Sequence, residues 1–248
     1  MNKVRIAQVG TNGMTHASTT FLSLRKQSDL FEVVGIAEPV DEWKQNLDKP
    51  PYKDVPHFTV EQLLQMDGLD AVAVETNEEY LTDYAQPFAD RGVAVHLEKP
   101  GSPDHAAFAR LARTLKEKHL PFHLGYMYRF NPLIRRACEM AAAGELGDII
   151  SVEAQMSCRH DDVLRQWLCR HPGGMMYYLG GHLVDLVYRL KGIPEEVIPL
   201  NASTGLDGSP AEDYGFAVLR YKNGVSFVKT SAAEVNGFAR RQLVISGT

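Results

Sequence analysis

The stretch VRIAQVGTNGMTHASTTFLSLRKQSDLFEVVGIAE, residues 4–38, decides how the first half of the chain folds. Its pattern predicts an apolar strand over 4–9, a turn beginning at Gly10, a helix over 17–26 and a second strand over 31–37. An acidic residue, Glu38, stands at the end of the second strand. Strand, glycine-bearing turn, helix, strand and acid follow one another in this order in dinucleotide-binding units.

The glycine fingerprint of this turn is incomplete. Gly10 fits the tight-turn position, but Asn12 and Thr15 stand where the second and third glycines are expected. Degenerate glycine turns between a strand and a helix are common, so the turn alone leaves a purely structural interpretation open. The binding interpretation predicts that the cofactor contacts Gly10, Thr11, Asn12, Gly13 and Met14.

Glu38 adds a cofactor preference. It lies at about the distance from the glycine turn at which an acid accepts hydrogen bonds from a ribose diol. A carboxylate there repels a 2′-phosphate, and no Arg or Lys follows in Pro39-Val40-Asp41. The sequence therefore predicts NAD in preference to NADP, although a solvated strand-end acid is the alternative.

The strand–helix alternation continues to about residue 124. Further strands are predicted over 70–75, 92–97 and 122–124, with helices over 79–90 and 103–118, which together favour a parallel sheet covered by helices on both faces. Two strand ends carry polar residues that we expect at the ligand-binding edge of the sheet. These residues are Thr76 and Asn77 after one strand, and Glu98 and Lys99, followed by Pro100, after the next. An ion-paired surface turn is the other interpretation of Glu98-Lys99-Pro100.

The pattern changes near Gly125. A helix over 132–143 is followed by predicted strands over 149–156, 196–198, 214–221, 225–231 and 240–245, which favours a largely antiparallel sheet with helices on one face. Asn223-Gly224 predicts a type I′ hairpin turn. The predicted fold class is thus α/β, with a dinucleotide-binding domain over 1–124 and an α+β domain over 125–248. The last strand has no closing element, so we expect either a partner at that edge or a chain truncated at its C-terminus.

Composition excludes several classes of function. The net charge of −5 offers no basic excess for nucleic acid, and no apolar run approaches the roughly 20 residues that span a bilayer. The N-terminus lacks a signal-peptide pattern. Cys138, Cys158 and Cys169 are an odd number without metal-binding spacing, which predicts neither disulfides nor a metal site and fits a cytoplasmic protein.

A second group of chemically capable residues lies in the C-terminal half. His182 and Asp185 are three residues apart on a predicted helix, so they share a face, and Tyr178 is expected on the same face. A histidine among small residues can act as an acid or base near neutral pH, whereas a helix-packing histidine beside a capping Asp is the alternative. Polar and aromatic residues elsewhere in this half are candidates for substrate binding: Tyr126, Arg129, Arg159 and Trp167, with Asp185. The stretch 158–168, which contains Arg159 and Trp167, fits a solvated surface segment equally well.

Together these motifs resemble the Gfo/Idh/MocA oxidoreductase family. The resemblance rests on the turn after Val9, on Glu98-Lys99-Pro100, on the segment 126–132 and on residues 173–185. It implies a Rossmann domain, a nicotinamide cofactor, and hydride transfer to or from a secondary hydroxyl or ketone of a sugar, sugar derivative or cyclitol. It also implies that Lys99 stabilises an alkoxide, that His182 is the general base or acid, and that the sheet of the second domain forms a homodimer or homotetramer.

One departure from the family pattern keeps other functions open. Tyr178 stands where the family commonly has an Asp four residues before the active-site His. Tyr178 is therefore a third candidate catalytic residue, as a proton donor. The alternatives are an NAD-using enzyme that cleaves glycosides by oxidation, elimination and reduction, and a non-catalytic paralogue that binds the cofactor.

Overall fold

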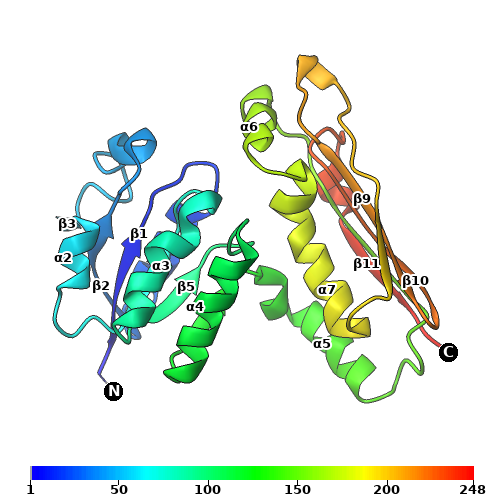
Figure 1. Cartoon of the computed structure of the whole chain (residues 1–248), viewed down its shortest axis with the longest axis horizontal. Helices are drawn as coiled ribbons and strands as arrows, with labels where there is room; N and C mark the ends of the chain where they lie inside the picture. The colour runs from blue at the N-terminus through cyan, green and yellow to red at the C-terminus, as the bar shows by residue number, and fades with distance from the viewer. Residues whose placement is uncertain (1) are drawn as a thin grey trace. The chain divides into compact units, whose positions relative to one another are not determined.

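The computed structural model describes residues 2–248, which form two compact units. The first unit ends at Gly125 and the second begins at Tyr126, whereas the sequence places the boundary one residue earlier. The first unit contains a six-stranded sheet and the second a five-stranded sheet (Figure 1). The predicted α/β fold class is confirmed.

The sheet of the first unit is entirely parallel, with the strand order β3-β2-β1-β4-β5-β6. Since β1 lies between β2 and β4, the strand order reverses there, and the crevice outside the carboxyl ends of β1 and β4 is the usual ligand site of such sheets. The strands are β1 Val4–Val9, β2 Phe31–Ala37, β3 His57–Phe58, β4 Ala71–Val74, β5 Ala94–Leu97 and β6 Phe122–Leu124. The helices are α1 Ala17–Lys26, α2 Val60–Leu64, α3 Leu81–Asp90 and α4 His105–Glu117, with short 3-10 turns η1 Asp41–Asn46 and η2 Glu78–Tyr80.

Apolar side chains hold helices against both faces of this sheet. On one face α3 and α4 lie side by side (Figure 1) and bury Phe88 and Leu111 against Val72 and Val95. A smaller cluster forms around Phe21 of α1. Burial of these side chains removes apolar surface from water, which is the main force that fixes the sheet and hence the ends of its strands.

The second unit packs helices against a mixed sheet of order β11-β7-β10-β9-β8. The β7–β10 pair is parallel and the other three pairs are antiparallel, as expected for a largely antiparallel sheet. Its strands are β7 Ser151–Ser157, β8 Glu196–Pro199, β9 Tyr214–Tyr221, β10 Gly224–Ser231 and β11 Gln242–Ser246. Its helices are α5 Pro132–Ala142, α6 Asp162–Trp167 and α7 Gly181–Lys191, with η3 Met127–Phe130, η4 Leu168–Arg170, η6 Leu206–Gly208 and η7 Gly237–Arg240 as 3-10 turns and η5 Met176–Gly180 as a π-helical turn.

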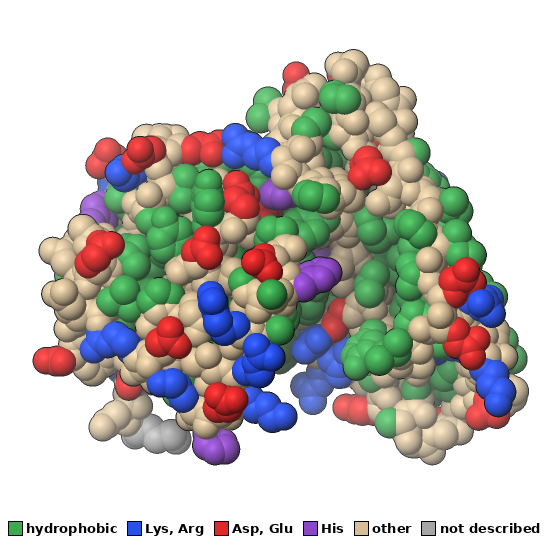
Figure 2. All heavy atoms as spheres, in the orientation of Figure 1, with side chains coloured by type: hydrophobic (Ala, Val, Ile, Leu, Met, Phe, Trp, Pro, Cys, Tyr) green, Lys and Arg blue, Asp and Glu red, His purple; other side chains and the backbone are tan. Residues whose placement is uncertain are grey.

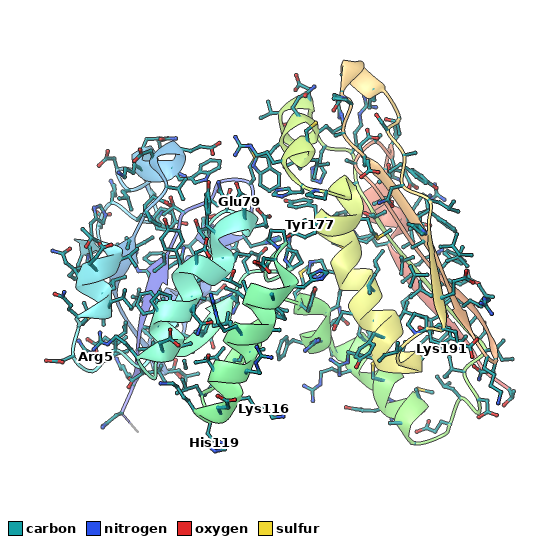
Figure 3. The ribbon with its side chains drawn as sticks, viewed as in Figure 1. Arg5, Glu79, Lys116, His119, Tyr177 and Lys191 are labelled. Atoms are coloured by element: carbon teal, nitrogen blue, oxygen red, sulfur yellow. The ribbon has the colours of Figure 1, made fainter. Side chains whose placement is uncertain are left out.

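Helix α7 is fixed at its C-terminal end by a lysine. Lys191, labelled in Figure 3, donates hydrogen bonds to the carbonyl oxygens of Ile149 and Ile150 at 2.6 and 2.9 Å. Its ammonium also lies 4.8 Å from the centre of the Tyr221 ring. These contacts tie the end of α7 to the segment just before β7 and to the β9–β10 hairpin.

The β9–β10 hairpin corrects one prediction. Tyr221 pairs with Gly224, so the two loop residues are Lys222 and Asn223 rather than Asn223 and Gly224. A type I′ turn needs positive φ at both loop residues. Among the described residues of this loop and its flanks, the positive φ belongs to Gly224, at +125°, so the type I′ prediction is wrong.

The distribution of charged side chains on the surface agrees with the nearly balanced numbers of acidic and basic residues in the sequence. Acidic and basic side chains are interspersed on the visible face of each unit (Figure 2). Within residues 2–248, each helix is too short or too polar to cross a bilayer.

Candidate functional site

The turn after β1 is built on a glycine that no other residue can replace without strain. Gly10 has a φ of +98°, and a Cβ there would lie 2.5 Å from the backbone nitrogen of Thr76 and 2.6 Å from the carbonyl oxygen of Glu75. The loop that follows β1 therefore packs directly against the loop that follows β4. Both loops reach the carboxyl edge of the sheet, where their backbone groups can approach a phosphate closely.

Asn12 stabilises this turn through its side chain. Its Oδ1 accepts a hydrogen bond from the backbone N–H of Met14 at 2.9 Å, and its Nδ2 lies 3.5 Å from the carbonyl oxygen of Thr76. Asn12 and Thr76 are both buried. Since the positive φ in this turn belongs to Gly10, Asn12 acts as a turn-forming side chain and not as a substitute for glycine flexibility.

Glu38 follows β2 directly and lies beside the same turn. One of its carboxylate oxygens, Oε2, accepts hydrogen bonds from the backbone N–H and the hydroxyl of Thr11, the latter at 2.6 Å. The other oxygen, Oε1, accepts from the N–H of Val40 at 2.8 Å. Burial raises the pKa of Glu38, and the hydrogen bonds from Thr11 and Val40 oppose this shift. A carboxylate has acceptor sites beyond these three, so Glu38 can still accept hydrogen bonds from a ribose diol.

Sequence reasoning missed Trp43 in η1. Its indole Nε1 donates to the Asn77 side-chain oxygen at 2.7 Å, and its ring covers Gly13, where a Cβ would lie 3.1 Å from Cζ3. Asn46 of the same segment donates to the carbonyl oxygen of Thr11 at 2.9 Å. The sequence signal that could have identified Trp43 is its position, five residues after the acidic residue that follows β2.

Glu98 and Lys99 follow β5 and are both almost completely buried. The Lys99 ammonium lies 3.6 Å from Glu98 Oε1, and the ring Nδ1 of His16 lies 3.7 Å from the same oxygen. Burial would raise the pKa of Glu98, but Lys99 and His16 outweigh it and lower that pKa. The hydrogen bond with Glu98 raises the pKa of His16. This edge of the sheet thus holds a buried cation next to an ionised acid, and His16 is a second residue that sequence reasoning missed.

In the second unit, His182 lies in the first turn of α7 and is buried between two tyrosine rings. The ring centres of Tyr126 and Tyr128 are 5.6 and 5.7 Å from that of His182, both in edge-on orientation. These contacts fix the plane of the imidazole.

Asp185 of α7 has an arginine partner. Arg129 of η3 donates from Nε to Oδ2 at 2.9 Å and from Nη2 to Oδ1 at 2.5 Å. Its guanidinium also lies 5.5 Å from the centre of the Tyr126 ring. Since Tyr126, Arg129, His182 and Asp185 are in contact with one another, the structure brings four of the predicted residues into one cluster.

Tyr178 belongs to a second cluster. Tyr178 lies within the π-helical turn over Met176–Gly180 that directly precedes α7, and its ring contacts those of Trp167 and His160, with centres 5.6 and 6.2 Å away. Arg159, the remaining predicted residue, is exposed at an isolated bridge to Ala233. The predicted catalytic residues are divided between the units, with Lys99 in the first and Tyr178 and His182 in the second.

Comparison with known proteins gives a consistent result for both units. Residues 4–126 match the model described as an oxidoreductase family with an NAD-binding Rossmann fold, and residues 134–248 match the GFO/IDH/MocA C-terminal domain. D-xylose 1-dehydrogenase (NADP(+)) 2 of Haloferax volcanii is 30% identical over 168 residues, which cover 67% of this chain and 51% of that protein. An uncharacterized oxidoreductase of Schizosaccharomyces pombe is 24% identical over 231 residues, covering 89% of this chain and 61% of that one.

A solved structure shares the fold over the whole chain. Myo-inositol 2-dehydrogenase from Lactobacillus plantarum superposes with a TM-score of 0.83 at 16% identity, covering 100% of this chain and 75% of that one. The chain spans about half the length of the xylose dehydrogenase that it matches, 51%. The two domain models follow one another along nearly all of the sequence, and the chain therefore belongs to the Gfo/Idh/MocA oxidoreductase family.

Proposed function

We propose that the protein is an NAD-dependent dehydrogenase that oxidises a secondary hydroxyl of a sugar, sugar derivative or cyclitol, or reduces the corresponding ketone. The observation that carries this proposal is the buried cation Lys99 beside Glu98, at the carboxyl edge of a sheet whose first turn suits a dinucleotide. The names of two similar proteins, a xylose dehydrogenase and an inositol dehydrogenase, support this substrate class.

The cofactor preference rests on Glu38. Its carboxylate keeps an acceptor lone pair for a hydrogen bond from the adenosine ribose, and its negative charge disfavours a 2′-phosphate. Lys44 is the first basic residue after Glu38 in the sequence, and its Nζ forms an ion pair with Asp41 Oδ1 at 2.5 Å. We therefore propose NAD for this chain, although the similar xylose dehydrogenase is named for NADP.

In this proposal the side chains of the protein transfer a proton and stabilise the negative charge on the reacting oxygen. A bound nicotinamide supplies the acceptor for the hydride that leaves the substrate carbon. Lys99 donates a hydrogen bond to the reacting oxygen and stabilises its alkoxide character, and His182 takes the hydroxyl proton. This requires that the two units present Lys99 and His182 to one substrate.

The other candidate residues receive supporting roles in this proposal. Arg129 orients Asp185 and the first turn of α7, so the pair is proposed to position His182. Tyr126, Trp167 and Arg159 are proposed to bind substrate hydroxyl groups. Tyr178 is proposed as an additional proton donor because it stands in the position of the family's carboxylate.

The test begins with cofactor binding and proceeds to turnover. NADH titrated into the purified protein should change its fluorescence at lower concentrations than NADPH, and NAD with a panel of polyols should produce NADH absorbance. A Lys99→Ala variant should lose turnover by about two to three orders of magnitude while NADH affinity stays within about twofold.

Three outcomes would change the proposal. Failure to bind either dinucleotide would contradict it, and undiminished turnover in Lys99→Ala would remove Lys99 from the mechanism. Cleavage of a glycoside without NADH accumulation would instead indicate the oxidation–elimination–reduction reaction. The mass of the same samples by light scattering tests the expected homodimer or homotetramer.

A further inference from the structure

One aromatic side chain bridges the crevice in which the first unit is expected to bind its cofactor. Trp43 lies in η1, which follows β2, and its indole reaches Asn77, which follows β4. Since β1 lies between β2 and β4, the indole crosses above the end of β1. The side chain therefore lies at the point where the strand order reverses, and ligands bind at this point in such sheets.

The indole covers the surface that a dinucleotide needs. It packs on Gly13 so closely that a Cβ at Gly13 would lie 3.1, 3.7 and 3.8 Å from three of its ring carbons. Trp43 is 8% exposed and Asn77 is 2% exposed, so the hydrogen bond between their side chains is buried. An aromatic platform for the adenine ring would leave the glycine surface open, whereas this indole occupies it.

The backbone and the side chain of Trp43 are held differently. The backbone is tied to the turn, because Asn46 of the same segment donates to the carbonyl oxygen of Thr11 at 2.9 Å. The indole is held by its hydrogen bond to Asn77 and by its contact with Gly13. Rotation about the Cα–Cβ bond can therefore withdraw the ring without moving η1 from the turn.

We propose that Trp43 is a gate over the adenosine end of the cofactor site, and that the indole must leave the crevice before a dinucleotide binds. This inference rests on the proposed function, because it assumes that a dinucleotide is the ligand. Glu38 marks the ribose of the adenosine half, and η1 follows directly after it. The measured affinity is then the affinity of the open state multiplied by the fraction of molecules in which the gate is open.

The gate predicts a gain of affinity on truncation, which is the opposite of what a stacking platform predicts. Trp43→Ala should bind NADH and ADP-ribose about tenfold more tightly than the wild-type protein in calorimetric titrations, because opening no longer breaks the bond to Asn77. Trp43→Phe keeps a ring but loses the donor, and should gain about threefold. Reduced nicotinamide mononucleotide, which lacks the adenosine half, should bind wild type and both variants equally.

Two controls separate the gate from general loosening of η1. Gln45→Ala changes an exposed residue of the same segment and should leave NADH affinity unchanged. In a Trp167→Phe background Trp43 is the sole tryptophan, and ADP-ribose should shift its emission to longer wavelength and increase its quenching by acrylamide as the ring moves into solvent.

The outcomes distinguish the gate from the proposed function. Equal or weaker NADH binding by Trp43→Ala and Trp43→Phe, with binding to wild type intact, would overturn the gate alone. An unchanged Trp43 emission at saturating ADP-ribose would do the same. Absence of binding by wild type and by every variant would overturn both, and binding by Trp43→Ala alone would support both.

Discussion

The two units hold their candidate residues by different means. At the turn after β1 in the first unit the contacts run mainly to the backbone: Glu38 accepts from the N–H groups of Thr11 and Val40, and Asn12 accepts from that of Met14. In the second unit the contacts run between side chains, since His182 lies between tyrosine rings and Asp185 pairs with Arg129.

This difference predicts different sensitivities to mutation. A site held by backbone groups depends on how closely two loops approach, so one added methyl group can disrupt it. A site held by side-chain pairs depends on the partner of each group, so truncating the partner is the damaging change. The following experiments test this comparison, beginning with the largest effect.

Gly10→Ala should be the most damaging substitution. The new Cβ would have to share space with the backbone of Glu75 and Thr76 at 2.5–2.6 Å, at a φ of +98° that alanine disfavours. We expect a loss of about 3–5 kcal/mol in the free energy of unfolding of the first unit, measured by urea titration followed by circular dichroism.

Gly92→Ala is the matched control for this prediction. Gly92 also has a positive φ, +86°, but among the described residues no atom lies within 4 Å of a Cβ built there. Its substitution should cost only the backbone strain, about 1 kcal/mol. Equal losses at the two positions would mean that the close approach of the loops does not stabilise the turn.

Arg129→Ala tests the side-chain contacts of the second unit. It leaves the Asp185 carboxylate, 7% exposed, without its guanidinium partner, but the Arg129 side chain is 41% exposed and its attraction is screened by water. We therefore expect a loss of about 1–2 kcal/mol in the free energy of unfolding. NADH affinity should be unchanged, because the first unit holds its own turn.

Arg136→Ala provides the comparison. Its pair with Glu145 joins side chains that are 59% and 44% exposed, so its loss should cost no more than about 0.5 kcal/mol. If Arg129→Ala is equally mild, the Arg129–Asp185 pair does not hold α7. If Arg129→Ala also abolishes NADH binding, the two units do not keep their sites independently.

The same difference explains how much the sequence predicts. Strands β1 and β2 and helix α1 match their predicted bounds, because apolar runs ended by Gly10 and Glu38 are local signals. Helix α4 begins at His105 and not at Pro103, because Asp104 caps it by accepting from the N–H groups of Ala106 and Ala107. Such a shift of two residues leaves the site unchanged.

The contacts that were missed all depend on residues distant in the sequence. Trp43 meets Asn77 only because β2 and β4 flank β1 in the sheet. The bond from Arg129 to Asp185 joins residues 56 positions apart, and spacing along a helix says nothing of such a partner. The π-helical turn before α7 likewise has no local signal, so the shared face expected for Tyr178 and His182 rested on a regular α-helical spacing that the chain does not keep.

The smallest effect concerns the charge next to Lys99. The pKa of His16 is raised, chiefly by its hydrogen bond with Glu98, while the pKa of Glu98 is lowered, so Glu98 stays ionised at neutral pH. Protonated His16 therefore stabilises the folded state fully below its unfolded pKa of about 6.5, and this contribution is lost as the pH rises through the folded pKa. His16→Gln should remove that dependence, but because the side chain is 52% exposed we expect a difference of only about 0.5 kcal/mol at pH 5.5.

This difference is best measured as the change with pH in the gap between wild type and His16→Gln. The gap should close at alkaline pH, and an NMR titration should show the pKa of His16 falling toward its ordinary value in Glu98→Gln. His105→Gln, at an exposed position of α4, controls for the loss of a histidine as such. A gap that stays constant from pH 5.5 to alkaline pH would mean that protonated His16 does not pair with Glu98, and that Lys99 is the partner that keeps Glu98 ionised.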